Sequence, residues 1–357
     1  MKVLIVAGGT GGHLYPGVSI AKILQEQNNE VLLVIRDQQW EKEVAGHYQI
    51  PFRTIAGTGL KKTVTGLARF ILNFWRGFRQ ARIMIREYRP DIILALGNYL
   101  SLPVGLAGRR YRVPLILHEQ NCLPGKAIRM LSSYASVICT SFAETGGYLP
   151  HYRDKIVVTG NPLRPEMMSV RESGADRSRK TLLIFGGSQG AHRLNMALIE
   201  ALDRLEELRR SLKIIHLTGQ KDLELVEQGY REKNFEVQIA PYENNMQDLY
   251  NQADLVVARA GALTLAELAF YGLPSILVPY PYAAENHQMI NARVWEKAGA
   301  ARILPDREAS GETLAELIMD LLKNDKQLQV MGQIAKELSY PSAAADIAKI
   351  IVRSSHV

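Results

Sequence analysis

Short apolar runs alternate with helix-forming segments along most of this chain, and this alternation restricts the fold more than any other feature. The runs "KVLIVA" at the start, "DIILAL" (91–96) and "DLVVARAG" (254–261) are typical. Runs without polar alternation are characteristic of strands buried on both faces. Strands that are separated by helices pair in parallel through right-handed crossovers. The sequence therefore predicts an α/β protein with parallel sheets.

The strand, glycine-rich turn and helix start of residues 2–16 recur in "TLLIFGGSQGAHRLN" (181–195). Between the two copies, "GNPLRPE" (160–166) and a polar stretch running to Lys180 form the best linker candidate. We predict two Rossmann-like, doubly wound domains that face a cleft, with residues 1–163 in the first and 164–340 in the second. Residues 341–357 are expected to pack back on the first domain, although their helical pattern suits either domain.

The composition limits the kinds of partner. A net charge of +7 permits nucleic acid, anionic lipid or a phosphorylated substrate. Aromatic residues make up only 7% and no nucleic-acid motif is present, so nucleic acid is the weakest of the three. No apolar run is long enough to span a membrane. Cys122 and Cys139 form no pattern, which favours a reducing cytoplasm, and no His/Cys spacing typical of zinc occurs.

The first glycine loop lies in "VAGGTGGHLYPGVSIA" (6–21). Glycines after a parallel strand let the backbone approach a ligand, and the N–H groups of the next helix suit a phosphate. The loop is not a dinucleotide fingerprint, because Leu14 replaces the third glycine, and it lacks the lysine of a Walker A loop. The alternative is a turn that only packs a strand on a helix.

His13 ends this loop at the start of the predicted helix. A helix N-terminus disfavours a protonated ring, which leaves a neutral imidazole able to remove a hydroxyl proton. His13 is therefore a candidate general base. The alternative is a hydrogen-bonded structural histidine.

Three further segments carry polar groups after predicted strands. Ser188 and Gln189 in "GGSQGA" offer hydroxyl and amide groups to phosphate or sugar oxygens. In "RAGALTLAELAFYGLP" (259–274), the N–H groups of residues 262–264 could hold a diphosphate and Glu267 could accept from ribose hydroxyls. The alternative for Glu267 is an exposed position on a helix whose other face is apolar. His287 and Gln288 suit a hydroxyl-rich ligand.

Six segments in order make the whole pattern specific. They are "GGTGGH" (8–13), "HEQN" (118–121), "GNPLR" (160–164), "GGSQGA" (186–191), "RAGALTLAE" (259–267) and "HQ..NA" (287–292). Together, from residue 3 to about 350, they resemble the MurG family, the UDP-N-acetylglucosamine transferases that convert lipid I to lipid II in bacterial peptidoglycan synthesis. The resemblance implies a GT-B architecture, with the acceptor in the first domain and the nucleotide sugar in the second.

The resemblance also implies roles for individual residues. In the first domain, Thr10, Gly11 and Gly12 match the diphosphate-facing loop. His13 matches the proposed base, and Asn121 matches the asparagine of "HEQN". Arg164, the first residue of the predicted second domain, matches an arginine near the nucleotide.

In the second domain, Ser188 matches the serine of the second loop, with Gln189 beside it. Tyr242 matches an aromatic residue that caps uracil, and the backbone of Glu243 would read the base edge. Ala262, Leu263 and Thr264 match the diphosphate helix. Glu267 matches the ribose ligand, and Gln288, next to His287, matches a ligand of the sugar hydroxyls.

Two positions depart from the family pattern. "GNY" (97–99) stands where GGY is usual, and Arg36-Asp37 stand where GT is common. The Asn98 departure could alter contacts to the acceptor, and neither departure touches the donor motifs.

The implied chemistry is a single in-line displacement that converts an α-linked donor to a β-1,4 product. It needs a base for the acceptor hydroxyl and stabilisation of the departing diphosphate. The chain has no D-x-D motif of the kind that metal-dependent glycosyltransferases usually present. We therefore expect no required metal ion and no cofactor, with helix N-termini and Arg164 taking the place of the metal.

The stretch "GLARFILNFWRGFRQARIMIRE" (66–87) predicts an amphipathic helix. Its predicted core face consists of Leu67, Phe70, Ile71, Phe74, Phe78, Ala81 and Ile85. Its other face mixes arginines with apolar side chains, and Lys61 and Lys62 precede it; we expect Lys61, Lys62, Leu72, Trp75, Arg76, Arg79 and Ile83 to dock on an anionic membrane surface. The alternative is a solvated basic face.

The expected location is thus the cytoplasmic face of the bacterial cell membrane, as a peripheral protein. The expected partners are UDP-N-acetylglucosamine, lipid I, anionic lipid and other proteins of cell-wall synthesis, and no nucleic acid. Two other enzyme classes remain as alternatives, an NAD-type oxidoreductase and a UDP-sugar epimerase. The oxidoreductase is considered because Asp37 follows the second predicted strand, where a ribose-binding acidic residue would stand. A non-enzymatic binder would leave the sugar-binding residue types unexplained.

Overall fold

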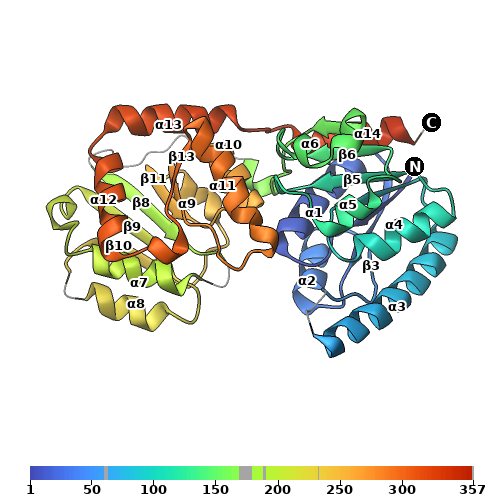
Figure 1. Ribbon diagram of the computed structural model, residues 1–357, viewed down its shortest axis with the longest axis horizontal. Coiled ribbons are helices and arrows are strands. Elements are labelled where there is room, and N and C mark those ends of the chain that lie inside the picture. Colours follow the sequence, from blue (N-terminus) through green and yellow to red (C-terminus); the bar gives the residue numbers. More distant parts are fainter. Residues whose placement is uncertain (60–62, 169–178, 188–189, 232, 356–357) are drawn as a thin grey trace. The chain divides into compact units, whose positions relative to one another are not determined.

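The computed structural model describes residues 1–59, 63–168, 179–187, 190–231 and 233–355. The chain divides into two compact units (Figure 1). Unit 1 comprises Met1–Pro165 and Tyr340–Val357, and unit 2 comprises Glu166–Ser339. The last segment of the chain thus belongs to the unit that the first segment builds.

Unit 1 is built on a parallel sheet. Among its described residues the sheet has seven strands, in the order β3-β2-β1-β4-β5-β6-β7. The strands are β1 (Lys2–Val6), β2 (Glu30–Ile35), β3 (Phe52–Thr54), β4 (Ile92–Ala95), β5 (Leu115–Glu119), β6 (Val137–Thr140) and β7 (Ile156–Val158). The chain order reverses between β1 and β4, and open α/β sheets bind ligands at the carboxyl ends of strands at such a point.

Helices cover both faces of this sheet (Figure 1). The helices of unit 1 are α1 (Gly11–Glu26), α2 (Gln39–His47), α3 (Val64–Tyr88), α4 (Ser101–Arg110), α5 (Lys126–Leu131), α6 (Thr145–Tyr148) and α14 (Ala343–Ser354), with a 3-10 turn at Pro150–Lys155. A second 3-10 turn, Pro165–Met168, begins at the last residue of Met1–Pro165 and continues into unit 2. Val3 and Ile5 face α1 and α14, whereas Leu4 and Val6 face α3 and α4. This two-sided burial explains why β1 reads as a continuous apolar run.

Unit 2 has a second parallel sheet. Among its described residues the strand order is β10-β9-β8-β11-β12-β13. The strands are β8 (Lys180–Phe185), β9 (Leu212–Leu217), β10 (Glu236–Ala240), β11 (Leu255–Ala258), β12 (Ser275–Leu277) and β13 (Ala301–Ile303). The chain order here reverses between β8 and β11, the same arrangement as in unit 1.

The helices of unit 2 are α7 (His192–Ala201), α8 (Leu223–Tyr230), α9 (Met246–Tyr250), α10 (Ala262–Tyr271), α11 (His287–Ala298), α12 (Gly311–Leu322) and α13 (Asp325–Glu337), with 3-10 turns at Glu206–Leu208, Ala284–Asn286 and Asp306–Glu308. Leu182 and Ile184 of β8 pack with Leu194 of α7 and Ile318 of α12 in one apolar core. A second α/β unit with its own core confirms the predicted fold class.

Helix α1 begins at Gly11, because the N–H groups of His13 and Leu14 both donate to the carbonyl of Thr10 at 3.0 Å. One local prediction was wrong. On α3, the predicted core face is buried only in its second half. Ala81 and Ile85 are buried, whereas Leu67 and Ile71 are 49% and 48% exposed. The helix is longer than the surface it packs against, so its first turns carry apolar side chains into solvent.

Candidate active site

The predicted substrate-site residues of unit 1 follow β1, β5 and β7, either in loops or in the first turn of α1, and Asn98 follows β4. Because these strands are parallel, their carboxyl ends meet at one edge of the sheet. That edge is where open α/β sheets bind ligands. The same reasoning applies in unit 2 to the loops after β10, β11 and β12.

A buried carboxylate holds the first glycine loop. Glu41 is fully buried, and it accepts hydrogen bonds from the N–H groups of Gly9 (3.1 Å) and Arg36 (2.8 Å) and from Arg36 Nε (2.5 Å). Arg36 Nη2 in turn donates to the carbonyl of Gly9 at 2.6 Å. A Cβ at Gly8 would lie 2.8 Å from Glu41 Oε2, and Gly9 has a φ of +129°, so both positions require glycine.

Thr10 and His13 lie together at the start of α1. Thr10 is the extended N-cap residue, and its Oγ1 lies 2.8 Å from His13 Nδ1. Gly11 and Gly12 form the first turn and are partly exposed, as is His13. The unpaired N–H groups of a first helical turn attract anions. This end of α1 therefore offers an imidazole beside an anion-binding backbone.

Asn98, a departure from the family pattern, is turned into the fold. Its side chain is 5% exposed, and Oδ1 accepts from the N–H groups of Leu100 (2.8 Å) and Ser101 (3.2 Å) at the start of α4. Its Nδ2 donates to the carbonyl of Val6 at 3.4 Å. Asn98 thus joins the start of α4 to the end of β1, a structural role that the sequence did not indicate.

The "HEQN" segment is a buried polar network. Glu119 is 3% exposed and accepts from the N–H groups of Asn121 (2.8 Å) and Gly125 (2.7 Å). Burial raises the pKa of Glu119 to about 7, against the opposing effect of those hydrogen bonds. Burial lowers the pKa of His118 to about 4, and its Nε2 lies 3.0 Å from the carbonyl of Gly160. The network holds the loop that carries Asn121.

Arg164 belongs to unit 1 in this structure, one residue before its boundary. Its guanidinium lies over the ring of Tyr15 in α1, 4.9 Å from the ring centre. The hydroxyl of Ser19 donates to the carbonyl of Leu163 at 2.7 Å, which ties the same segment to α1. Arg164 therefore packs against α1, the helix whose N-cap residue is Thr10.

In unit 2, α10 begins directly after β11 with Gly261 as its N-cap. Ala262, Leu263 and Thr264 form its first turn and are partly exposed. Glu267 lies in the second turn of α10 and is only 7% exposed. Tyr250 Oη donates to its Oε2 at 2.8 Å. The alternative of an exposed glutamate was therefore wrong, and Tyr250 is a partner that the sequence did not reveal.

Of the remaining predicted residues of unit 2, Tyr242 and Glu243 lie in the loop after β10, whereas His287 and Gln288 begin α11. Tyr242 is 50% exposed after β10, and Glu243 Oε1 accepts from the N–H of Asn245 at 2.8 Å. Gln288 Oε1 accepts from the N–H of Tyr280 at 2.8 Å, and His287 Nδ1 lies 2.8 Å from the carbonyl of Ala284. Both side chains thus shape the loop after β12. Ser188 and Gln189 lie outside the described residues.

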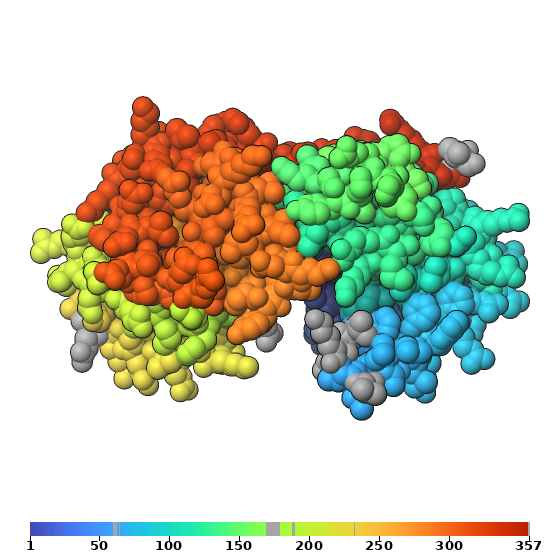
Figure 2. Space-filling model, in the orientation of Figure 1, coloured from blue at the N-terminus to red at the C-terminus, as the bar shows by residue number. Residues whose placement is uncertain are grey.

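The surface of α3 carries the predicted membrane-docking side chains. Leu72, Trp75 and Ile83 are 58%, 57% and 57% exposed, and Arg76 and Arg79 are exposed beside them. In the space-filling view the segment that forms α3, coloured lighter blue, lies on the outside of unit 1 (Figure 2). Lys61 and Lys62 lie outside the described residues. Within the part of the chain that is described, no helix has both the length and the apolar character needed to cross a bilayer.

Over the described ranges, no cluster of three or more His, Cys, Asp or Glu side chains could hold a metal ion.

Comparison with known proteins decides the family. The N-terminal domain of glycosyltransferase family 28 matches residues 3–140, and the C-terminal domain of that family matches residues 181–348. The chain belongs to glycosyltransferase family 28. The protein is therefore a sugar-transferring enzyme. The two alternatives, an NAD-type oxidoreductase and a UDP-sugar epimerase, are not favoured.

The relatives of this family 28 chain are similar over their whole length. A protein of Geobacter sulfurreducens named UDP-N-acetylglucosamine--N-acetylmuramyl-(pentapeptide) pyrophosphoryl-undecaprenol N-acetylglucosamine transferase is 40% identical, over 99% of both chains. A crystal structure of Acinetobacter baumannii MurG has a TM-score of 0.82 and 30% identity, over 99% of both chains. These matches confirm the resemblance to the MurG family.

A putative UDP-N-acetylglucosamine 2-epimerase from Listeria monocytogenes also has a similar structure. Its TM-score is 0.72 and its identity 18%, with 97% of this chain and 94% of that chain covered. At this identity the likeness shows the fold alone.

Proposed function

We propose that this protein transfers N-acetylglucosamine from UDP-N-acetylglucosamine to the C4 hydroxyl of the N-acetylmuramoyl unit of lipid I, which gives lipid II. The observation that carries this proposal is the 40% identity, over 99% of both chains, to a transferase named for this reaction. The polar loops at the sheet edges of both units support it, since they provide the residue types that a nucleotide sugar and a lipid-linked acceptor need.

Unit 2 is the donor domain in this proposal. The N–H groups of Ala262, Leu263 and Thr264 lie in the first turn of α10, where the helix provides no carbonyl acceptor for them. They can therefore hold the diphosphate of UDP. Glu267 accepts from the ribose hydroxyls, and its burial beside Tyr250 supports this role by fixing the carboxylate. Half-exposed Tyr242 can cover the uracil ring, and the backbone of Glu243 can read the base edge.

Unit 1 is the acceptor domain. His13 acts as the base that removes the proton of the acceptor hydroxyl at Nε2, while its Nδ1–H donates to Thr10 Oγ1. The 2.8 Å distance between those two atoms supports the contact, which orients the ring and leaves Nε2 for the acceptor. The N–H groups of Gly11 and Gly12 can bind the diphosphate of the lipid carrier. Asn121, held by Glu119, would add a polar contact to the acceptor.

The displacement leaves negative charge on the β-phosphate of UDP. The start of α10 stabilises that charge by backbone N–H groups and by the helix dipole, which contributes about 0.3–1 kcal/mol and up to about 2 kcal/mol in sheltered sites. Arg164 would supply a full positive charge. We propose that these groups suffice without a divalent metal ion.

The protein reaches its lipid-linked acceptor through α3. Exposed apolar side chains on this helix stand among arginines, and this combination is typical of helices that lie in a lipid interface. Anionic lipid attracts each nearby arginine by about 1 kcal/mol. The charge complementarity favours an anionic bilayer surface as the partner of α3, so the protein works as a peripheral membrane protein.

Product formation from UDP-N-acetylglucosamine and a lipid I analogue tests the proposed function. We expect UDP release that depends on the acceptor and a product heavier than the acceptor by one N-acetylhexosamine, detected by mass spectrometry. Consumption of the nucleotide sugar without an acceptor, with a new UDP-sugar as product, would instead support the epimerase.

A further inference from the structure

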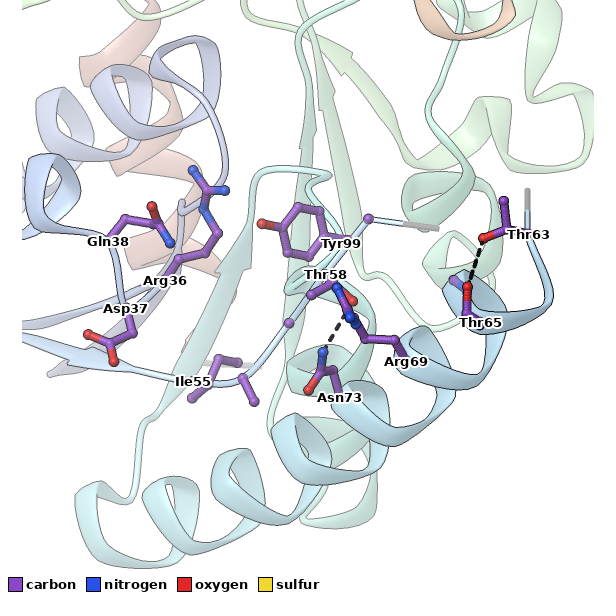
Figure 3. Close-up of a pocket in the computed structure, with 14 residues that line it drawn as sticks. Arg36, Asp37, Gln38, Ile55, Thr58, Thr63, Thr65, Arg69, Asn73 and Tyr99 are labelled. Atoms are coloured by element: carbon purple, nitrogen blue, oxygen red, sulfur yellow. Dashed lines mark hydrogen bonds between the residues drawn. The ribbon is translucent and has the colours of Figure 1, made fainter. Parts of the chain in front are cut away.

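Unit 1 contains a large polar pocket that is distinct from the proposed binding sites for the diphosphate and for UDP. Its volume is about 850 Å³, and it lies between the end of β2, the segment 55–59 after β3, and the first turns of α3 (Figure 3). Arg36, Thr58, Arg69, Asn73 and Tyr99 contribute its polar lining. Binding sites for ligands larger than a few atoms commonly have volumes of about 300–1,000 Å³. The pocket is therefore large enough for an extended ligand.

The walls of this pocket are held in place by hydrogen bonds and close packing. Gln80 Oε1 accepts from the N–H of Ala56 at 2.7 Å, and Asn73 Nδ2 donates to Thr58 Oγ1 at 3.4 Å (Figure 3). A Cβ at Gly77 would lie 2.3 Å from the carbonyl oxygen of Ala56, so α3 approaches segment 55–59 closely. The pocket thus has a defined shape.

Two arginines make the pocket attractive to an anion. The side chain of Arg36 is 24% exposed and is fixed by Glu41 and the carbonyl of Gly9. Burial acts to lower the pKa of Arg36, but its contacts with Glu41 and Tyr99 outweigh this effect and the net pKa is raised, so the guanidinium stays charged. Arg69 is exposed on α3 and makes no ion pair with any described residue. The acidic Asp37 at the rim is paired with Lys42 at 2.6 Å.

The pocket adjoins the first glycine loop. Arg36 lines the pocket and also binds the carbonyl of Gly9, one residue before Thr10. In Figure 3 the ring of Tyr99 lies between Arg36 and Arg69, with its hydroxyl toward Arg36. A ligand anchored near His13 can therefore extend into this pocket.

We propose, on the basis of the proposed function, that this pocket binds the peptide stem of the acceptor and that Arg36 and Arg69 bind its carboxylates. Three observations favour a peptide over a diphosphate. A diphosphate would fill only a small part of about 850 Å³. The threonine hydroxyls and the Asn73 amide suit the hydrogen-bonding groups of a peptide backbone. The start of α1 already offers backbone N–H groups to a diphosphate.

Arg36 also has a consequence for specificity. It stands at one of the two positions where the sequence departs from the pattern of the MurG family, and it contributes one of the two guanidinium groups that line the pocket. Arg36 is thus a positioning residue for the glycine loop and a binding residue for the peptide. Arg69 carries only the second role, so it is the better position for a test.

Steady-state kinetics of Arg69→Ala with acceptors that carry a short, water-soluble prenyl chain test the proposal without a membrane. With the free-acid peptide, we expect the KM for the acceptor to rise about 10-fold, with kcat and the KM for UDP-N-acetylglucosamine unchanged. Arg69→Lys keeps the charge and should stay within about threefold of the wild type. Arg110→Ala removes an exposed arginine of unit 1 outside the pocket and should leave all three parameters unchanged.

Two further acceptors separate the possible anions. One has its peptide carboxylates amidated, and the other lacks the peptide but keeps the diphosphate. The wild type should bind both more weakly, and Arg69→Ala should have no further effect on either. An equal rise in KM for all three acceptors would assign Arg69 to the diphosphate and overturn the proposal, as would an unchanged KM for the free-acid acceptor.

The outcome for the proposed function can be read separately. If the wild type transferred no N-acetylglucosamine to any acceptor, the proposed function would fail. Calorimetric titration with peptidyl-N-acetylmuramic acid alone would still test the pocket. Binding to the wild type that Arg69→Ala weakens about 10-fold supports the pocket assignment, and no binding to the wild type overturns it.

Discussion

Thr10 Oγ1 and His13 Nδ1 lie 2.8 Å apart at the first turn of α1. Because the ring uses Nδ1 for this contact, only Nε2 remains for a substrate. If Nδ1 carries the proton and donates it to Thr10, Nε2 is a proton acceptor. The Thr10 contact thus orients the ring and leaves Nε2 as the atom that can act as a general base.

Loss of the Thr10 hydroxyl should reduce the rate without weakening donor binding. We expect Thr10→Val to lower kcat about 10-fold, because the imidazole loses the hydrogen-bonding partner that fixes its orientation, and Thr10→Ser to retain most activity. The KM for UDP-N-acetylglucosamine should not change. Steady-state kinetics check this, and equal rates for the valine and serine variants would show that the hydroxyl does not matter.

Glu267 and Tyr250 should act together in donor binding. We expect Glu267→Gln to weaken UDP binding about 10- to 100-fold, since a charge-assisted hydrogen bond to ribose becomes neutral. Tyr250→Phe removes the donor at 2.8 Å from Glu267 Oε2 and should weaken binding less, about threefold. Calorimetric titration with UDP and with its 2′,3′-dideoxy analogue checks this. A full Glu267→Gln effect on the dideoxy analogue would argue against a ribose contact.

The stability of unit 2 should fall in mild acid because of His216. This residue is fully buried, with Nδ1 3.2 Å from Tyr230 Oη and Nε2 3.1 Å from Asn195 Oδ1, and burial lowers its pKa to about 4. An unfolded histidine titrates near 6.5. The unfolded state therefore binds more protons than the folded state between pH 6.5 and 4. The contribution of His216 is complete above pH 6.5 and is lost as the pH falls, by up to about 1.4 kcal/mol per pH unit.

Urea unfolding of the whole chain from pH 7.5 to 4.5 measures this loss. His216→Gln lacks the titrating ring, so its unfolding free energy should depend less on pH than that of the wild type, although it is lower at pH 7.5. His118 of unit 1, whose pKa is also about 4, is present in the wild type and in His216→Gln. Its contribution to the pH dependence is therefore common to both and cancels in the comparison. Parallel pH curves for the two proteins would contradict the assignment to His216.

Membrane docking should depend on the mixed surface of α3. We expect the triple variant Trp75→Ser, Arg76→Ser, Arg79→Ser to lose most of its sedimentation with anionic vesicles, because it loses an apolar anchor and two cations of about 1 kcal/mol each. Leu225→Ser removes an exposed apolar side chain of unit 2 and should bind vesicles like the wild type. Unchanged sedimentation of the triple variant would indicate that α3 is only a solvated basic face.

The sequence predicted the strands, the two parallel sheets and the loops that follow them, because the two-sided burial of residues such as Val3 and Leu4 leaves a continuous apolar run. It could not predict where α3 stops packing, since Leu67 and Ala81 occupy equivalent positions of one helical face and only tertiary contact distinguishes them.

The polar networks were equally hidden from sequence. Glu41 occupies an ordinary position in a charged helix, and only the folded chain brings its carboxylate to Gly9 and Arg36. Tyr250 and Glu267 are 17 residues apart and meet through the packing of two helices. The glycine loops could be predicted from the sequence because their backbone geometry requires glycine at particular positions. The buried residues that hold these loops could not, because nothing in the neighbouring sequence marks them as partners.

We propose that backbone N–H groups and a neutral imidazole carry out the transfer without a metal ion. The decisive measurement is transfer of N-acetylglucosamine from UDP-N-acetylglucosamine to a lipid I analogue in EDTA, for the wild type and for His13→Ala. We predict an undiminished wild-type rate in EDTA and a kcat for His13→Ala that is lower by about 10²- to 10⁴-fold. Abolition of the wild-type rate by EDTA, or a His13→Ala rate equal to that of the wild type, would contradict it.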